Sequence, residues 1–337
     1  MNKTLAILSV AFILIISAVV YEIYSPNTKP TKQAHACSVE SSMVIVQGGD
    51  MLMGAGGMYP EEFPVVERKV NSFYMSRTEV TNAEFKAFVE ATGYVTMAEK
   101  APDPSLYPDL PPDLLVAGSA VFVKLNEAVS AGTLMNWWHF VEGAYWRQPT
   151  GPNSSIIGKE NYPVVHIAYQ DAQAYAAWKG HRLPTEEEFE YAARNGLKNS
   201  QYARGDSLTT NNKHTANTWQ GLFPFSDDGD DGHAGLAPVG CYDANRYGIH
   251  DLIGNVWEWT QSTYYPQHIQ DNEQIPTHFP NQGYDPNQPG IAVGVIKGGS
   301  YLCADDFCMR YRPAARQAQD TGLGTTHIGF RTVKSVN

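Results

Sequence analysis

The first part of the chain alternates short apolar runs with turn-forming residues, a pattern that predicts β-strands. Residues 43–46 and 51–53 are apolar and flank a glycine-containing stretch at 47–50, which predicts a strand, a turn and a second strand. Residues 65–74 predict one further strand. The body of the protein is therefore expected to begin with β-structure.

Three later segments carry the 3.6-residue period of amphipathic helices. The first starts at Thr81, whose spacing to Glu84 predicts a capping box, and it stops at Gly93. The second spans residues 170–179, and the third starts at Thr185. The residues predicted to face the core are Phe85, Phe88 and Val89 in the first helix, Ala174, Ala177 and Trp178 in the second, and Phe189, Ala192 and Ala193 in the third.

After residue 196 the chain is rich in Gly, Asn, Asp, Pro and aromatic residues, with few runs able to sustain a helix. Such a loop-rich chain needs side chains, water or ions to satisfy its backbone polar groups. Residues 102–153, which contain three tryptophans, predict a packed insertion and not a separate module. No linker or repeat divides the body, so we expect one domain over residues 43–334.

The N-terminus differs from the rest of the chain. Lys3 precedes an uninterrupted apolar run at 5–21, close to the shortest length of a membrane-spanning helix. We expect residues 1–24 to be an uncleaved signal-anchor, with a cleaved signal peptide as the alternative, and residues 25–42 to be a tether. The body would then be exported, either anchored in the inner membrane and facing the periplasm, or soluble in the periplasm or secreted.

Export also bears on two of the four cysteines. An oxidising compartment permits a disulfide between Cys37 and Cys241. The sequence does not show that the two residues meet, and two unrelated cysteines are an equally good interpretation.

The charge balance narrows the classes of partner. A net charge of -11 argues against nucleic-acid binding, because phosphate neutralisation needs clustered Lys and Arg. Acidic residues concentrate at 227–231, which favours a hard cation, with a solvated acidic loop as the alternative. The sequence also lacks the motifs of zinc proteases, P-loop nucleotide-binding proteins and serine hydrolases.

Two cysteines near the C-terminus carry the most distinctive chemistry. Cys303 and Cys308 lie in a segment that opens with glycines and continues with Arg310 and Arg312. Two thiolates form a soft ligand pair that suits Cu(I), or they form a redox-active disulfide, whereas a structural zinc site needs four ligands. On spacing alone, a surface disulfide or two buried free thiols is an equally weighted alternative.

The motifs around this pair resemble those of the formylglycine-generating enzymes, the sulfatase-modifying factors. The resemblance covers residues 43–333, nearly everything outside the N-terminal tail. The resemblance implies an irregular single α/β (α+β) domain, a variant of the C-type-lectin-like fold with little regular secondary structure. Here the N-terminal apolar helix precedes this domain. The runs that carry it are VVHIAYQDAQAYAAWKGHRLPTEEEFEYAARNG (164–196), ANTWQGLFP (216–224), YGIHDLIGNVWEWT (247–260), GGSYLC (298–303), CMRYRPAAR (308–316) and HIGFR (327–331).

The resemblance implies an oxidoreductase that uses Cu(I) and O2. It implies that Cys303 and Cys308 bind Cu(I), and that Ser300, Trp257 and Arg310 lie at the active site. The implied reaction oxidises a cysteine in a Cys-x-Pro-x-Arg segment of an unfolded exported sulfatase to Cα-formylglycine, with a thiol as reductant. On the residues alone, Ser300 is as readily a turn hydroxyl and Trp257 a core residue.

The resemblance also implies one or two structural Ca2+ ions. Oxygen-rich loops supply the six to eight ligands that Ca2+ prefers. The implied ligands are Asn217, Asp231 and the carbonyls of Thr218 and His233 at the first site, and Asp251, Glu258 and the carbonyls of Gly254 and Val256 at the second.

Three positions depart from the pattern of the eukaryotic members. Ala304 replaces a frequent histidine, Phe307 a frequent tyrosine and His327 a frequent asparagine, and some bacterial members resemble this chain there. These changes do not indicate inactivation. His327 is a possible proton carrier, although a lone histidine is more often structural.

Two other functions are compatible with the superfamily. A non-catalytic lectin-like binding module would have no need for the cysteine pair. An iron-dependent sulfur oxidase would need a helical domain with a histidine triad, for which this chain has no room.

Overall fold

The computed structural model describes residues 37, 39–104, 111, 115–125, 137–199, 201–202, 205, 207–211, 213–269 and 282–336. The predicted anchor and most of the predicted tether lie outside these residues. Within them, no helix has the length and apolar character needed to cross a membrane.

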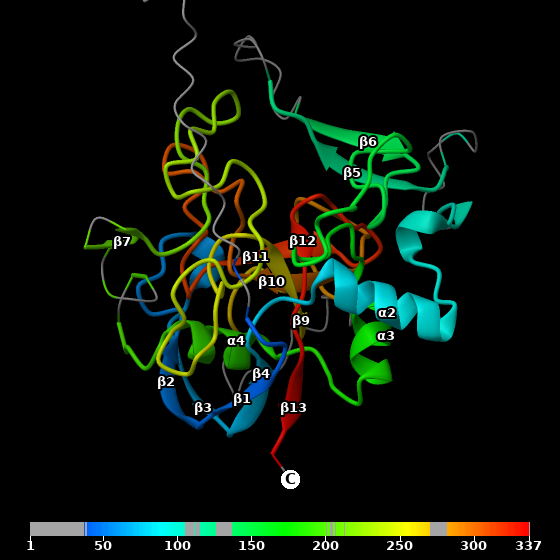
Figure 1. Ribbon diagram of the computed structural model, residues 1–337. Helices are drawn as coiled ribbons and strands as arrows, with labels where there is room; N and C mark the ends of the chain where they lie inside the picture. Colours follow the sequence, from blue (N-terminus) through cyan, green and yellow to red (C-terminus); the bar gives the residue numbers. More distant parts are fainter. Residues whose placement is uncertain are drawn as a thin grey trace, which may run out of the picture. The chain divides into compact units, whose positions relative to one another are not determined.

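The described part of the chain contains three α-helices and thirteen short strands, joined by long loops (Figure 1). The helices are α2 (Asn82–Thr92), α3 (Tyr169–Trp178) and α4 (Glu186–Ala193), and η1 (Pro60–Glu62) and η2 (Met97–Glu99) are single 3-10 turns. The strands are β1 (Met43–Val46), β2 (Gly49–Met53), β3 (Val66–Val70), β4 (Phe73–Ser76), β5 (Gly118–Phe122), β6 (Trp138–Glu142), β7 (Thr209–Thr210), β8 (Lys213–His214), β9 (Trp257–Thr263), β10 (Val293–Lys297), β11 (Arg316–Asp320), β12 (Ile328–Gly329) and β13 (Val333–Ser335). The expectation of one irregular domain with few helices is confirmed.

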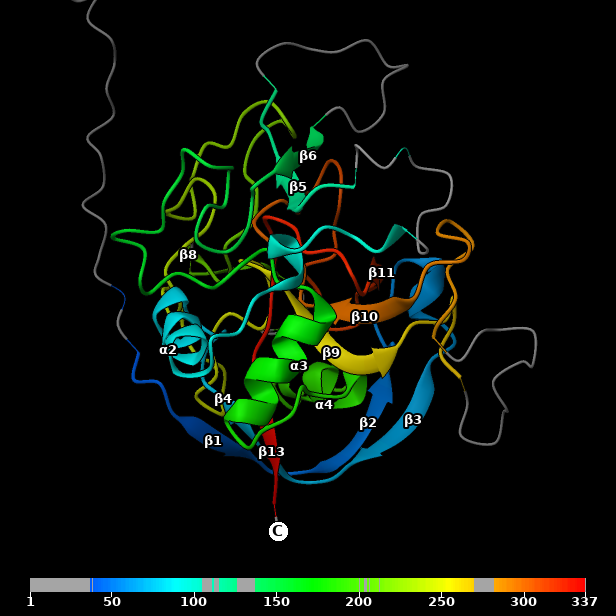
Figure 2. The same ribbon diagram turned by 90° about the vertical axis from the view of Figure 1, so that its right-hand side faces the viewer.

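The two larger sheets combine strands that are distant in sequence. One has the order β1-β4-β13, and the other has the order β11-β10-β9-β12, in which only the β12–β9 pair is parallel. The pairs β2–β3, β5–β6 and β7–β8 form separate two-stranded sheets. Figure 1 shows the β5–β6 hairpin at one end of the domain and β1, β2 and β3 at the other, and Figure 2 shows the same separation after the turn.

Two hydrophobic clusters form most of the core. One packs aromatic residues of α2 and α3 against β9, β10 and β12, and it includes Cys303. The other packs α4 against the strands β1 to β4. The loop that carries the cysteine pair follows β10, so it starts from a strand that packs in the first of these clusters.

Capping explains why two of the helices start where the sequence predicts. The Thr81 side chain accepts the Glu84 N–H at 3.2 Å and the Glu84 carboxylate accepts the Thr81 N–H at 2.9 Å. Thr185 and Glu188 form the same pair of bonds at the start of α4. The inward faces predicted for α2 and α4 are confirmed.

Two predictions about these elements are wrong. Residues 65–74 do not form one strand, because Asn71 and Ser72 separate β3 from β4 and the two strands join different sheets. Helix α3 buries Ala172, Tyr175 and Ala176, and half-buried Ala174 packs against the core as predicted, whereas Ala177 and Trp178 are exposed. Tyr175 decides this orientation, since its ring packs against Phe85, Phe88 and Phe330.

Candidate active site

The loop after β10 folds Cys303 and Cys308 onto each other. The Cys303 N–H donates to the Ser300 carbonyl at 2.9 Å and the Cys308 N–H donates to the Ala304 carbonyl at 2.8 Å, so two turns reverse the chain. The two Sγ atoms lie 3.1 Å apart and both cysteines are reduced. Cys303 is buried and Cys308 is half-buried, so Cys308 is the member of the pair that solvent reaches.

A glycine allows the two ends of this loop to approach closely. Gly299 has a φ of 74°, and a Cβ atom there would lie 2.7 Å from the Arg310 carbonyl oxygen. Any other residue would push residues 310–311 away. The glycines at the start of the loop therefore help to place Arg310 near the cysteines.

The two thiols differ in acidity because their surroundings differ. A hydrogen bond from Cys303 and the positive charge of Arg310 lower the pKa of Cys308 to about 6 against the effect of burial. Burial raises the pKa of Cys303 well above its ordinary value. At neutral pH the pair therefore consists of one accessible thiolate that accepts a hydrogen bond from one buried thiol.

The donor set of this pair fits Cu(I). Two sulfurs converge, one is already ionised, and Arg310 offsets negative charge on the sulfurs. In the described part of the chain, no histidine or carboxylate joins the two cysteines to make a cluster of three ligands. The site therefore fits a metal that accepts two sulfur ligands better than tetrahedral zinc.

Of the other predicted active-site residues, Ser300 lies in the same loop as the cysteine pair and Trp257 lies in the same hydrophobic cluster as Cys303. Ser300 is fully buried, and its Oγ accepts the Leu302 N–H at 3.2 Å. Trp257 is 1% exposed and packs in the same hydrophobic cluster as Cys303 and Tyr311. Ser300 thus shapes the loop, while Trp257 forms an apolar wall of the core.

The three positions that depart from the family pattern are also placed. Ala304 is fully buried, and Phe307 is half-exposed and stacks on Phe223 with 4.4 Å between ring centroids. His327 bonds through Nδ1 to Thr325 Oγ1 at 2.6 Å, and burial lowers its pKa to about 3. Burial therefore favours the neutral form of His327 at physiological pH, which favours a structural role for this residue.

The first predicted calcium site is a loop organised by Asp231. Its carboxylate accepts the N–H groups of Thr218 at 2.9 Å and His233 at 3.0 Å. The Oδ1 atom of buried Asn217 has no hydrogen-bond partner. Asp227 lies in the same loop, and burial together with repulsion by Asp231 raises its pKa. Burial also raises the pKa of Asp231. An oxygen-seeking cation would satisfy the unpaired oxygen and offset these charges.

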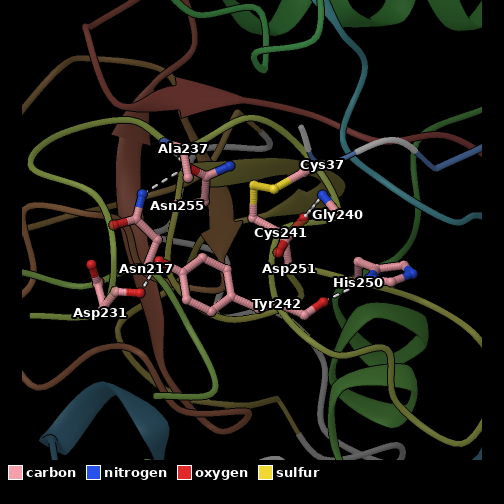
Figure 3. The surroundings of a disulfide bond; sticks show 10 residues. All are labelled: Cys37, Asn217, Asp231, Ala237, Gly240, Cys241, Tyr242, His250, Asp251 and Asn255. Carbon is pink, nitrogen blue, oxygen red and sulfur yellow. Dashed lines mark hydrogen bonds between the residues drawn. A yellow bond between two sulfur atoms is a disulfide. The ribbon is translucent and has the colours of Figure 1, made fainter. Parts of the chain in front are cut away.

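The second predicted calcium site contains one buried acidic residue more than the sequence predicted. Asp251 Oδ2 accepts the Gly240 N–H at 2.6 Å, but its Oδ1 has no hydrogen-bond partner (Figure 3). Glu79, which sequence reasoning missed, is fully buried, and its Oε2 has no hydrogen-bond partner but lies 3.9 Å from Arg331 Nη2. Burial first, and then repulsion by Asp251, raises the pKa of Glu79.

The remaining residues of this site are placed less favourably for a cation. Both oxygens of Glu258 bond to Arg331, each at 2.7 Å. Gly254 and Val256 lie in the same turn, where the Gly254 N–H donates to the Gly298 carbonyl at 2.9 Å. The three buried carboxylates of Glu79, Asp251 and Glu258 are thus accompanied by one arginine, Arg331. The excess negative charge of this group suits a divalent cation, with Glu79 as an added donor.

A disulfide ties the N-terminal segment to this region. Cys37 and Cys241 are bonded, and Cys241 lies between Gly240, which donates to Asp251, and Tyr242 (Figure 3). The His233 ring lies within 4.8 Å of both sulfurs. Bonded sulfurs offer no thiolate to a metal, so this group acts as a covalent tie.

Sequence reasoning also missed the partners of Arg310. Its guanidinium pairs with Glu61 and lies over the Tyr59 ring. A tyrosine and an acid in a Pro-containing turn carry no periodic signal, so only the structure shows this contact.

The chain is similar to several known proteins. Residues 28–336 match the sulfatase-modifying factor enzyme 1-like domain. The formylglycine-generating enzyme of Mycobacterium tuberculosis is 46% identical over 87% of this chain and 97% of its own. A bovine protein named inactive C-alpha-formylglycine-generating enzyme 2 is 42% identical over 86% of this chain and 87% of its own.

Among solved structures, PvdO from Pseudomonas aeruginosa has the same fold, with a TM-score of 0.56 and 21% identity over 92% of this chain and all of that chain. The domain match and the high identity over nearly full length, together with the paired reduced cysteines, lead to one conclusion. The chain belongs to the formylglycine-generating enzyme (sulfatase-modifying factor) family.

Proposed function

We propose that this protein activates sulfatases by converting one of their cysteines into Cα-formylglycine. The observation that carries the proposal is the reduced pair of Cys303 and Cys308, with Sγ atoms 3.1 Å apart, in a domain of this family. Family membership alone is not sufficient, because the family includes relatives named inactive.

The proposed reaction is an oxidation by O2. The substrate is an extended sulfatase segment with the sequence Cys-x-Pro-x-Arg, whose cysteine lies beside Cys308. One substrate cysteine, one O2 and two reductant thiols give one aldehyde, one hydrogen sulfide, one disulfide and one water. The two electrons from the side chain and the two from the thiols together reduce O2.

The residues of the chain prepare the pair for this reaction. Bound Cu(I) would supply the O2 chemistry, with Cys303 and Cys308 as its ligands. The ionised Cys308 is the accessible sulfur, Cys303 holds it by a hydrogen bond, and Arg310 offsets the negative charge. Trp257 and Tyr311 pack in the same hydrophobic cluster as Cys303, on the buried side of the pair.

The acidic loops have a structural role in this proposal. Ca2+ held around Asp231 and around Asp251 with Glu79 would fix the irregular loops on either side of the disulfide. We further propose that residues 1–24 anchor the domain on the exported side of a membrane, where unfolded sulfatases would pass.

The second candidate function is a binding module without catalysis. The inactive relatives favour it, while the reduced and unequal thiols of this chain argue against it. The two functions differ in whether a bound peptide changes in mass.

A peptide assay tests the proposal. The protein is loaded with Cu(I) and incubated in air with a thiol and a peptide that contains Cys-x-Pro-x-Arg. We expect the peptide to lose about 18 Da, the difference between a thiol and an aldehyde side chain, while a matched peptide with Ser for Cys stays unchanged. Peptide binding without a mass change would leave the binding module as the better account.

A further inference from the structure

The cation beside the thiol pair is held by a segment from the far end of the domain's sequence. Arg310 Nη2 lies 2.6 Å from Glu61 Oε1, and the Arg310 guanidinium carbon lies 4.1 Å from the centroid of the Tyr59 ring. The Tyr59 hydroxyl accepts the Met309 N–H at 3.1 Å. The η1 turn and its N-cap residue Tyr59 thus contact the chain directly after Cys308, although Glu61 precedes Arg310 by 249 residues.

This segment is itself rigidly fixed. Glu62 and Arg312 form a fully buried ion pair, with Arg312 Nη1 2.9 Å from Glu62 Oε2. The Glu61 carbonyl accepts a hydrogen bond from Arg316 Nη1 at 3.1 Å. The backbone of η1 is therefore anchored independently of Arg310, and it presents the Glu61 carboxylate from a fixed position.

Two opposite effects of Glu61 can be distinguished. Arginine has considerable rotamer freedom, and an ion pair combined with ring stacking confines its planar group to one orientation. Confinement next to Cys308 favours a negatively charged pair of metal-bound thiolates. The negative charge of Glu61 itself, in contrast, disfavours such a centre. Removal of Glu61 therefore changes metal affinity in a direction that depends on which effect is larger.

We propose that Glu61 and Tyr59 are positioning residues that hold Arg310 against Cys308, so that soft-metal binding by the thiol pair depends on the η1 segment. This inference rests on the proposed function in one respect, because it takes Cys303 and Cys308 as the metal-binding pair. The ion pair is only partly exposed, with side-chain exposures of 24% for Arg310 and 16% for Glu61, so solvent weakens it only in part.

Cu(I) affinity is the direct test. It is measured anaerobically on the full protein by competition with a chromophoric Cu(I) chelator, for Glu61→Gln, Arg310→Gln and the double variant. We expect each single variant to bind Cu(I) about three- to tenfold more weakly, in line with the loss of a charge-assisted contact. The double variant should be no weaker than Arg310→Gln alone, because Glu61 acts through Arg310.

Three further variants, one control and two tests, complete the series. Glu67→Gln removes an exposed carboxylate from the neighbouring strand β3 and should leave the affinity unchanged. Tyr59→Leu removes the ring beneath Arg310 and should weaken binding as Glu61→Gln does. Glu61→Asp keeps the charge but shortens the side chain, so it should also weaken binding, and it replaces Glu61→Gln if that variant does not fold.

The outcomes are distinct. Equal or tighter Cu(I) binding by Glu61→Gln, or additive losses in the double variant, would overturn the inference while leaving peptide oxidation by the wild type intact. A wild-type protein that binds no Cu(I) would overturn both this inference and the copper-dependent reaction.

Discussion

Cys308 is the residue whose chemistry the structure defines most sharply. Its pKa of about 6 means that the thiolate predominates at neutral pH, so alkylation by iodoacetamide should reach half its maximal rate near pH 6 in the metal-free protein. In Arg310→Gln the half-maximal point should move upward, because the thiolate loses a nearby positive charge. Peptide mass spectrometry after timed alkylation gives the rate at Cys308 separately from Cys303. A wild-type profile that rises only near pH 8.5, as for an ordinary cysteine, would contradict this assignment.

The buried carboxyl group of Glu79 should link the stability of the protein to pH and to calcium. Its pKa is raised in the folded protein, so the folded state holds the proton more tightly than the unfolded chain. Without a cation, this residue lowers stability as the pH rises above the ordinary carboxyl pKa of about 4.3. Ca2+ would replace the proton, so it should raise the melting temperature more at about pH 8 than at about pH 5.

A matched pair of variants assigns this calcium effect to the site. Glu79→Gln should raise the melting temperature of the chelator-treated protein, because it removes a buried charge, and should reduce the gain from Ca2+. Glu67→Gln, which changes an exposed carboxylate, should alter neither quantity. A gain from Ca2+ that is the same at both pH values and in both variants would place the ion elsewhere.

The sequence predicted residues with distinctive chemistry better than it predicted their partners. Cys303 and Cys308 stand out because few side chains bind soft metals, and the structure brings them together. Glu61 and Glu79 are ordinary acidic residues in a chain with 35 Asp and Glu, so nothing local marks them. Their roles arise from burial and from contacts across the fold, which a single sequence does not contain.

The N-terminal segment is tied covalently to the domain by one disulfide bond. The Cys37–Cys241 disulfide closes a loop with a sequence separation of 204 residues. Such bonds stabilise mainly by restricting the unfolded chain, so the double variant Cys37→Ser/Cys241→Ser should lose about 2–4 kcal/mol of unfolding free energy. Urea unfolding of the two proteins measures the loss. Equal midpoints and slopes would show that the tie does not restrict the unfolded chain.

Helix starts were predictable and strand boundaries were not. The capping residues Thr81 and Thr185 act within four residues of chain, so their pattern is visible in sequence. The division of residues 65–74 into β3 and β4 depends on which sheet each half joins, and these partners lie far away. The buried face of α3 likewise follows from the aromatic neighbours of Tyr175, and its weak amphipathic pattern misled the prediction.

For the whole molecule, the family fold was predictable because its motifs recur along nearly the entire chain. Residues 28–336 match one domain, yet strands and helices make up only a part of it. Loops of this kind are held by buried ion pairs such as Glu62–Arg312 and Arg331–Glu258 and, in the proposed function, by Ca2+. The loop-rich architecture is thus a framework that brings η1 and the cysteine loop into contact.

In the proposed function Cys303 and Cys308 together form the reaction centre, and single serine variants show whether both are needed. Cys303→Ser and Cys308→Ser, each with a native circular dichroism spectrum, are compared with the wild type for the loss of about 18 Da from a Cys-x-Pro-x-Arg peptide in air. We expect conversion by the wild type and none by either variant. Conversion that persists in either folded variant would contradict it.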